Sequence, residues 1–290
     1  LLSDDRIHAV IVSTPPSTHA SWALRILESG RHVILEKPMA LTADDCDAVL
    51  TKAADSGLTA LVYQNRRFDP DFLVLQDLSR SGRLGDVFHA EAFVGGYGHP
   101  CNYWHSEMSI SGGALFDWGS HVVDQLLQLM DGDIAYVTAL NHKRMWHDVT
   151  NADHARLSIV MVDGREATFV YSDLAAARKP RWYVLGTRGA VTGDWRYERV
   201  VSRSATGTLE EDVLAPADAP PTMRFTSPDG SVTVLAERPR DPHPFHADLA
   251  LALRYGVPAR INPQQSRDVV AVLQAAEESA SLGGIPVKPS

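Results

Sequence analysis

HAVIVSTPPSTHASWALRILESGRHVILEKP (residues 8–38) contains two short apolar runs on either side of a longer amphipathic segment. The runs His8–Ser13 and Arg31–Leu35 are rich in β-branched residues and end in turn-forming sequence, so we predict two buried strands. A helix is predicted between them over Thr18–Ser29, and Gly30 ends it. The chain therefore begins with a β-α-β unit.

The same order continues through the next segments. Thr42 opens a second helix as Thr-x-x-Asp, a weaker form of the capping box. A third strand is predicted over Leu58–Tyr63. The order β-α-β-α-β with short loops implies parallel strands and right-handed crossovers. Ligands bind beyond the carboxyl ends of such strands. The loops at those ends are residues 14–16 (Thr-Pro-Pro), 36–38 (Glu-Lys-Pro) and 64–67 (Gln-Asn-Arg-Arg).

A second pattern begins at Val87, where apolar and polar residues alternate as in a half-buried strand. Later runs repeat this alternation and favour an antiparallel sheet, with turns at Asp163-Gly164, Arg188-Gly189 and Asp229-Gly230. The runs are Ile134–Asn141, Ala155–Val162, Ala167–Ser172, Trp182–Gly186, Ala190–Trp195 and Val232–Leu235. Helices are expected at Phe245–Tyr255 and Arg267–Ser281, and a surface loop at Ala215–Pro221.

One predicted helix carries an unusual polar stripe. In Ser111–Gln128 (SGGALFDWGSHVVDQLLQ), apolar residues gather on one side, and the other side carries Asp117, His121, Asp124 and Gln128. A solvated polar face is the simpler interpretation. The alternative is a functional site, because a carboxylate one turn from an imidazole orients it and raises its basicity.

The bulk composition excludes several classes of function. The chain of 290 residues has a net charge of −9, which argues against binding nucleic acid or an anionic membrane surface. No apolar run approaches the roughly 20 residues that span a bilayer. Two cysteines make no disulfide framework, so we expect a cytoplasmic protein. No residues have metal-ligand spacing beyond a partial set on the polar stripe, and we predict no metal.

Three motifs in order carry a family resemblance. They are Thr-Pro-Pro followed by His19, Glu36-Lys37-Pro38, and Gly-Gly-x-Leu-x-Asp-x-Gly-x-His-x-x-Asp over residues 112–124. With the closing segments PFHADLALALRYGVPARI and VVAVLQAAEESASLGGIPV, the chain resembles the Gfo/Idh/MocA oxidoreductases. That family takes its name from glucose–fructose oxidoreductase, inositol dehydrogenase and the rhizopine-catabolism protein MocA.

The resemblance implies an α/β fold in two parts and a hydride-transfer activity. Residues 1–66 would be the C-terminal part of a dinucleotide-binding Rossmann domain with an incomplete parallel sheet. Residues 67–290 would form an α+β domain for substrate binding and oligomerisation, built on a large, mostly antiparallel open sheet. The implied cofactor is NAD or NADP, and the implied substrate is a sugar, inositol or similar polyol.

The resemblance also implies roles for individual residues. The catalytic residues would be Lys37, Asp117 and His121: His121 takes the hydroxyl proton, Lys37 holds charge at that oxygen, and Asp117 orients His121. The residues expected beside the cofactor are Thr14, Pro15, His19, Glu36, Lys37 and Gln64. Those expected beside the substrate are Asn65, Arg66, Tyr103, Trp104, Asp117 and Asp124. His105 stands where several relatives have Arg, which leaves the specific substrate open.

One departure and two alternatives accompany the resemblance. Family members begin with a strand and a Gly-x-Gly-x-x-Gly turn that receives the pyrophosphate, and this sequence has no such turn. We therefore expect the chain to be a fragment of a longer enzyme. The alternatives are an NAD-dependent glycoside hydrolase of the same family and a non-catalytic ligand-binding or oligomerising subunit. A homodimer or homotetramer through the antiparallel sheet is expected by resemblance.

Overall fold

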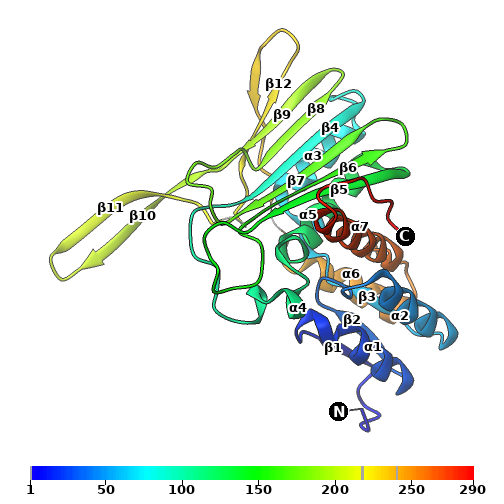
Figure 1. Cartoon of the computed structure of the whole chain (residues 1–290). Coiled ribbons are helices and arrows are strands. Elements are labelled where there is room, and N and C mark those ends of the chain that lie inside the picture. The colour runs from blue at the N-terminus through cyan, green and yellow to red at the C-terminus, as the bar shows by residue number, and fades with distance from the viewer. Residues whose placement is uncertain (1, 217–218, 240) are drawn as a thin grey trace.

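The N-terminal segment forms the predicted β-α-β-α-β unit, in a computed structural model that describes residues 2–216, 219–239 and 241–290. Three strands pair in parallel in the order β1-β2-β3, and two helices connect them (Figure 1). The bounds are β1 Ala9–Val12, α1 His19–Glu28, β2 His32–Leu35, α2 Ala43–Asp55 and β3 Ala60–Val62. The predicted parallel sheet is confirmed.

A larger sheet of eight strands follows, in the order β13-β12-β9-β8-β4-β7-β6-β5. All its neighbours are antiparallel except β4 and β7, which run parallel, so the prediction of a mostly antiparallel sheet is confirmed. The bounds are β4 Val87–Gly95, β5 Ile134–His142, β6 His154–Met161, β7 Glu166–Ser172, β8 Trp182–Gly186, β9 Gly189–Asp194, β12 Thr222–Thr226 and β13 Val232–Val234.

Three strands were absent from the prediction. The strands β10 (Tyr197–Ser204) and β11 (Gly207–Leu214) pair only with each other and project from the body as a hairpin (Figure 1). Their sequences carry charges on both sides of the strand, so no alternation marks them. Strand β12 is short and is held between β9 and β13. The surface loop predicted at Ala215–Pro221 includes residues 217–218, which lie outside the described residues.

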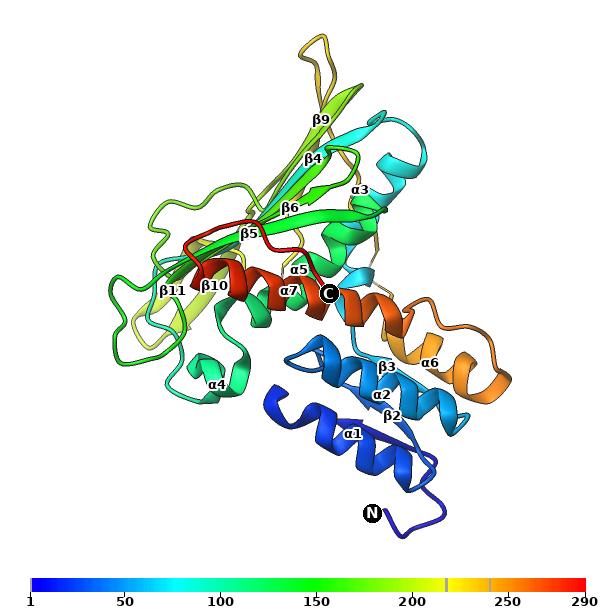
Figure 2. The same ribbon diagram turned by 45° about the vertical axis from the view of Figure 1, so that its right-hand side comes forward.

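Helices fill the space between the two sheets (Figure 2). Helix α5 (Ala114–Met130) packs against β4 and β7 and against α7 (Pro263–Ser281). Helix α7 in turn contacts β5 on one side and α2 and β3 on the other, so it bridges the two sheets. The remaining helical segments are η1 Pro16–Thr18, η2 Asn65–Phe68, α3 Pro70–Arg80, η3 Trp104–Ser106, α4 Met108–Ser111 and α6 Pro244–Tyr255.

The middle of the polar stripe of α5 is buried, whereas its two ends are partly exposed. Asp124 is 1% and His121 8% exposed, while Asp117 and Gln128 are half-buried. The stripe faces η2, whose Arg66 carbonyl accepts a hydrogen bond from the Gln125 side chain. The buried polar groups of this helix need hydrogen-bond partners, and the residues described below supply several of them.

The start of α5 depends on glycine. Gly112 ends α4 with φ of 90°, a left-handed conformation that other residues rarely adopt. A β-carbon there would lie 2.6 Å from Phe116 and 2.8 Å from Leu41. The chain therefore turns tightly between α4 and α5, which holds the first turn of α5 against the parallel sheet.

The C-terminal segment returns to the parallel sheet. Phe245 of α6 and Ile261 form a small buried cluster with Ile34 of β2. The main core is continuous as well, and joins Val33 of the small sheet to Phe169 of the large one. The domain boundary between residues 66 and 67 stays a prediction. In space, α6 lies in the layer of the parallel sheet, although its residues fall in the predicted second domain.

A buried carboxyl group lies behind the first turn of α5. Glu277 of α7 accepts a hydrogen bond through Oε2 from the Asn141 side chain at 2.7 Å. Within the described part of the chain, its Oε1 and the Asn141 Oδ1 are both buried without a partner. Burial raises the pKa of Glu277 to about 7, and the Asn141 bond only partly opposes this rise.

This raised pKa predicts a pH-dependent stability. Below the pKa of the unfolded chain both states are protonated, whereas between that value and about 7 only the unfolded state releases its proton. The fold therefore loses up to about 3 kcal/mol as pH rises through this window. Glu277→Gln should be more stable than wild type by up to this amount at pH 8 and equal to it at about pH 4.5, measured by urea unfolding.

The control is Glu278→Gln, one residue along α7 and exposed to solvent. Its free energy of unfolding should follow the wild type at both pH values. A Glu277→Gln variant with the same stability difference at both pH values would contradict the assignment of the buried carboxyl.

Candidate functional site

Lys37 and Asp117 meet at the carboxyl edge of the parallel sheet. Lys37 follows β2, and Asp117 lies in the first turn of α5. The Lys37 Nζ donates to Asp117 Oδ1 at 2.6 Å and to the Asp117 backbone oxygen at 3.0 Å. Residues 80 positions apart in sequence are thus joined by an ion pair that is only partly exposed. A held ammonium at a sheet edge is suited to stabilise negative charge on a ligand oxygen.

A cavity of about 240 Å³ opens beside this pair. Five of the predicted site residues line it, namely Thr14, Glu36, Lys37, Trp104 and Asp117. Burial raises the pKa of Glu36, while the neighbouring Lys37 charge opposes the rise. The cavity therefore combines one ion pair, one carboxyl group in a partly buried position and one aromatic wall.

His19 lies behind the cavity. Its side chain is fully buried, with Nδ1 2.8 Å from the Pro38 carbonyl oxygen and Nε2 2.8 Å from the Thr14 carbonyl oxygen. The ring thereby ties the loop after β1 to the loop after β2. In this arrangement His19 positions the loops that carry Thr14 and Lys37, and both of its nitrogens are used within the protein.

Two amide side chains follow β3 at the same edge. Gln64 is 1% exposed, and neither its Oε1 nor the Oδ1 of Asn65 has a hydrogen-bond partner in the described structure. Unpaired buried acceptors are costly unless a donor reaches them. Asn65 lines a separate cavity of about 330 Å³ together with Tyr63 and Asp69.

His121 is placed one turn beyond Asp117 and is not among the residues that line the 240 Å³ cavity. Burial holds the pKa of His121 well below its ordinary value, and the charges of Lys37, Arg66 and Arg181 add to this effect. Its Nδ1 is buried without a partner in the part of the chain that the structure describes. The lowered pKa favours the neutral ring and makes it a weaker base than a histidine exposed to water.

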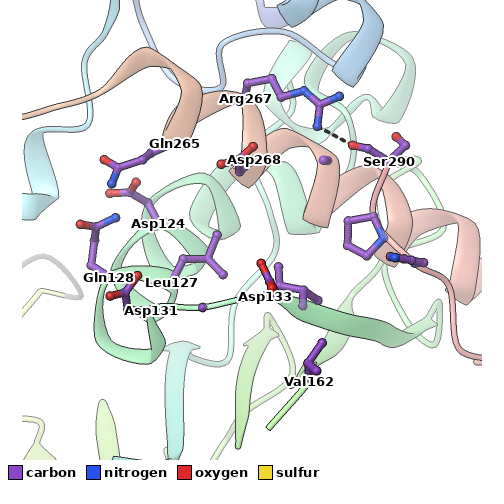
Figure 3. Close-up of a pocket in the computed structure, with 15 residues that line it drawn as sticks. Asp124, Leu127, Gln128, Asp131, Asp133, Val162, Gln265, Arg267, Asp268 and Ser290 are labelled. Carbon is purple, nitrogen blue, oxygen red and sulfur yellow. Dashed lines mark hydrogen bonds between the residues drawn. The ribbon is translucent and has the colours of Figure 1, made fainter.

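Asp124 lies away from Lys37. It forms a double hydrogen bond with the Arg67 guanidinium, at 2.7 and 2.6 Å, and both side chains are buried. Arg67 also donates to Gln265 of α7 at 2.7 Å. Asp124 lines a different cavity of about 510 Å³ at the end of α5, with Gln128 and Asp131 (Figure 3). The structure does not bring Asp124 together with the Lys37–Asp117 pair.

Three further predicted residues, Pro15, Arg66 and Tyr103, do not line the cavity. Arg66 pairs with Asp69 at 3.0 Å and stacks over the Trp118 ring at 4.6 Å. Tyr103 is 57% exposed, and Pro15 precedes the η1 turn. None of these three side chains is among those lining the 240 Å³ cavity.

Five lining residues were not among the assigned site residues, namely Ser13, Pro16, Pro38, His105 and Ser111. Pro16 and Pro38 belong to the predicted loops 14–16 and 36–38, Ser13 directly precedes the first of them, and His105 was noted only as a position where several relatives have Arg. His105 and Ser111 come from η3 and α4, whose position over the sheet depends on the fold of the loop after β4. No local pattern predicts that position.

No group of three His, Cys, Asp or Glu side chains within residues 2–216, 219–239 and 241–290 is arranged to hold a metal ion. The same ranges contain no helix long and apolar enough to cross a membrane.

Two family descriptions match the chain. Residues 1–64 match "Oxidoreductase family, NAD-binding Rossmann fold", and residues 72–192 match "GFO/IDH/MocA C-terminal domain". The cavity lies where loops of the first matched segment meet the first turn of α5 in the second.

Individual proteins are similar over different lengths. The scyllo-inositol 2-dehydrogenase (NADP(+)) IolW of Bacillus subtilis is 26% identical over 286 residues, which cover 97% of this chain and 78% of that protein. An uncharacterized oxidoreductase of Schizosaccharomyces pombe is 32% identical over 159 residues, which cover 54% of this chain and only 43% of its own length. The crystal structure of an NAD-binding protein from Listeria innocua superposes with a TM-score of 0.79 at 25% identity, covering 99% of this chain and 83% of that one.

The residues at the sheet edge fit the nicotinamide end of such a cofactor. The unpaired acceptor of Gln64, the Glu36 carboxyl and the Lys37 ammonium offer both acceptors and a donor to ribose hydroxyls and to an amide. The site lies at the carboxyl ends of parallel strands, where dinucleotides bind in sheets of this type.

Proposed function

Because the chain belongs to the Gfo/Idh/MocA oxidoreductase family, we propose that it carries the reaction centre of an NAD(P)-dependent oxidoreductase. The reaction is hydride transfer between nicotinamide and a CH–OH carbon of a sugar, inositol or similar polyol. The observation that carries this proposal is the Lys37–Asp117 ion pair on the wall of a cavity at the carboxyl edge of the parallel sheet. The inositol dehydrogenase among the similar proteins supports the substrate class.

The proposed roles follow from charge and position. A bound nicotinamide supplies the acceptor for the hydride that leaves the substrate carbon. The Lys37 ammonium hydrogen-bonds the substrate oxygen, and Asp117 holds that ammonium in place at 2.6 Å. As the family resemblance implies, His121 receives the proton of the same hydroxyl, which requires its ring, one turn beyond Asp117, to reach the cavity that it does not line here. One hydride and one proton leave the alcohol, so the product is a ketone.

The contributions of the other residues are assigned by their surroundings. Gln64 and Glu36 would offer acceptor atoms to the cofactor, and His19 fixes the loops that carry Thr14 and Lys37. Trp104 provides an apolar wall for a sugar or polyol. Asp124 is omitted from the substrate contacts because Arg67 occupies both of its oxygens.

The test is an assay of the protein expressed from its natural coding sequence. It is incubated with NAD⁺ or NADP⁺ and with myo-inositol, scyllo-inositol or glucose, and reduced cofactor is followed by absorbance. We expect reduction with at least one polyol and one of the two cofactors. Cleavage of a glycoside without accumulation of reduced cofactor would replace this proposal with the hydrolase alternative. Binding of a polyol with neither reaction would favour a non-catalytic subunit.

We further propose a cytoplasmic homodimer or homotetramer that associates through the large sheet. Helices α5 and α7 pack on one face of this sheet (Figure 2). Tyr136, Leu140 and Tyr183 alternate with buried strand residues and are 37–41% exposed. An exposed set of large apolar side chains on a sheet is suited to pairing with a second copy.

A further inference from the structure

The ring of His105 is held in a fixed orientation at the mouth of the cavity. It stacks on Trp104, with ring centroids 3.5 Å apart and planes at 23°, and it meets the Tyr103 ring edge-on at 4.8 Å. Together with Lys37 and Asp117 it lines the 240 Å³ cavity. Stacked aromatic rings restrict each other's rotation, so the imidazole presents one edge to the cavity.

The loop that carries His105 is anchored from a distant segment. The His105 backbone oxygen accepts a hydrogen bond from the Asn151 side chain at 2.8 Å. The next carbonyl, that of Ser106, accepts from the Thr150 and Asn151 backbone amides at 3.2 and 3.1 Å. The segment after β5 thus holds two consecutive carbonyl groups, those of His105 and Ser106. The backbone that carries the ring is therefore fixed without a ligand.

Only one nitrogen of the ring is left for a ligand. Nδ1 is buried and has no partner, whereas Nε2 is not enclosed and bonds to none of the residues that the structure describes. A neutral imidazole has a donor on one nitrogen and an acceptor on the other. In either tautomer, therefore, Nε2 can form a hydrogen bond with a hydroxyl group. Burial lowers the pKa of His105; the Asp117 charge opposes this and the Lys37 charge adds to it.

The cavity wall carries no unpaired positive charge. The Lys37 ammonium is matched by the Asp117 carboxylate, and the other ionisable wall residue besides His105 is the Glu36 carboxyl. A phosphate or carboxylate on the substrate would meet only the Lys37 ammonium, which Asp117 already neutralises, and would lie close to the Glu36 carboxyl, so its lost hydration would be poorly compensated. Hydroxyl groups lose much less hydration free energy when they enter such a cavity.

We propose that His105 hydrogen-bonds a substrate hydroxyl through Nε2 and makes the cavity selective for uncharged polyhydroxy compounds over sugar phosphates and sugar acids. This assignment rests on the proposed function, and names the charge class of its substrate. Trp104 supplies the apolar surface, and His105 supplies the polar contact beside it.

The test measures binding by calorimetry, with myo-inositol as the neutral probe and inositol monophosphate and glucuronate as the anionic probes. The protein is the full natural chain. We expect the wild type to bind myo-inositol and to bind both anions at least 10-fold more weakly. His105→Ala should weaken myo-inositol at least 10-fold, and His105→Asn, which keeps a neutral hydrogen-bonding group, should recover part of the loss. His105→Arg should strengthen binding of the anions.

The matched control is His99→Ala. His99 belongs to the same loop and also packs on a tryptophan ring, Trp146, at 4.8 Å, but it pairs with Asp148 outside the cavity. Its removal should leave all three affinities unchanged. Nitrogen-15 NMR of the histidine rings adds a readout that loss of packing would not imitate, because myo-inositol should shift the Nε2 signal of His105 and not that of His99.

The outcomes separate the two proposals. If the wild type binds none of the three probes, the proposed function fails. If the wild type binds myo-inositol, but His105→Ala and His105→Asn bind it equally well and its Nε2 signal does not move, the role of His105 alone is overturned. Equal wild-type affinity for the neutral and anionic probes would overturn the charge selectivity.

Discussion

Lys37→Met is expected to lower kcat for polyol oxidation by about 10²–10⁴-fold while the protein stays folded. The methionine keeps the apolar stem but removes the charge that faces the substrate oxygen and the partner of Asp117. The measurement is steady-state reduction of NAD(P) with the polyol that the wild type uses, together with the thermal unfolding midpoint. Because the Lys37 side chain is partly exposed, we expect little change in that midpoint.

Lys179→Met is the matched control. Lys179 is also ion-paired with a carboxylate, that of Glu91, but it lies outside the 240 Å³ cavity. Its variant should retain the wild-type kcat. A Lys37→Met enzyme with wild-type kcat would remove Lys37 from the catalytic residues, and would leave the fold and the family assignment intact.

Asp124→Ala is expected to lower the free energy of unfolding by about 3–5 kcal/mol. The side chains of Arg67 and Asp124 are only 8% and 2% exposed, so removing the carboxylate leaves a buried guanidinium without its partner. The double variant Arg67→Met with Asp124→Leu replaces both charges by apolar groups, and should recover much of the loss. Urea unfolding of Asp124→Leu, Arg67→Met and the double variant measures the coupling.

The control pair is Arg238 and Asp77, whose side chains are 49% and 48% exposed. Asp77→Ala should cost less than about 1 kcal/mol because water solvates the charge that remains. If Asp124→Ala and Asp77→Ala lose the same amount, the buried pair contributes no more than a surface pair and the interpretation is wrong.

Much of the fold follows from local patterns. The strand Ala9–Val12 and the cap at Thr42 both form, because each follows from neighbouring residues. The prediction that this strand is buried was wrong, since only Val12 is enclosed and Ile11 is 59% exposed. The hairpin Tyr197–Leu214 was missed, since charged residues occupy both of its faces and it buries little against the body. Periodicity predicts only those strands that pack one face against a core.

Part of the candidate site could also be predicted from the sequence, and part of it could not. Topology places Glu36 and Lys37 at the sheet edge, and the acid-and-imidazole spacing marks Asp117 on its helix. That Lys37 and Asp117 meet was implied only by the family resemblance. The polar stripe itself gave no means to separate Asp117 from Asp124, although they face different cavities. That distinction depends on Arg67, which enters from another segment and takes both oxygens of Asp124.

The return of α6 to the parallel sheet limits how this protein can be recombined with others. A chimera that exchanges only residues 1–66 would place a foreign strand opposite Phe245 and Ile261, whose side chains fit Ile34. The exchangeable module is therefore discontinuous in sequence and includes α6 with the segment up to Ile261. A chimera that keeps this contact must therefore exchange both stretches together.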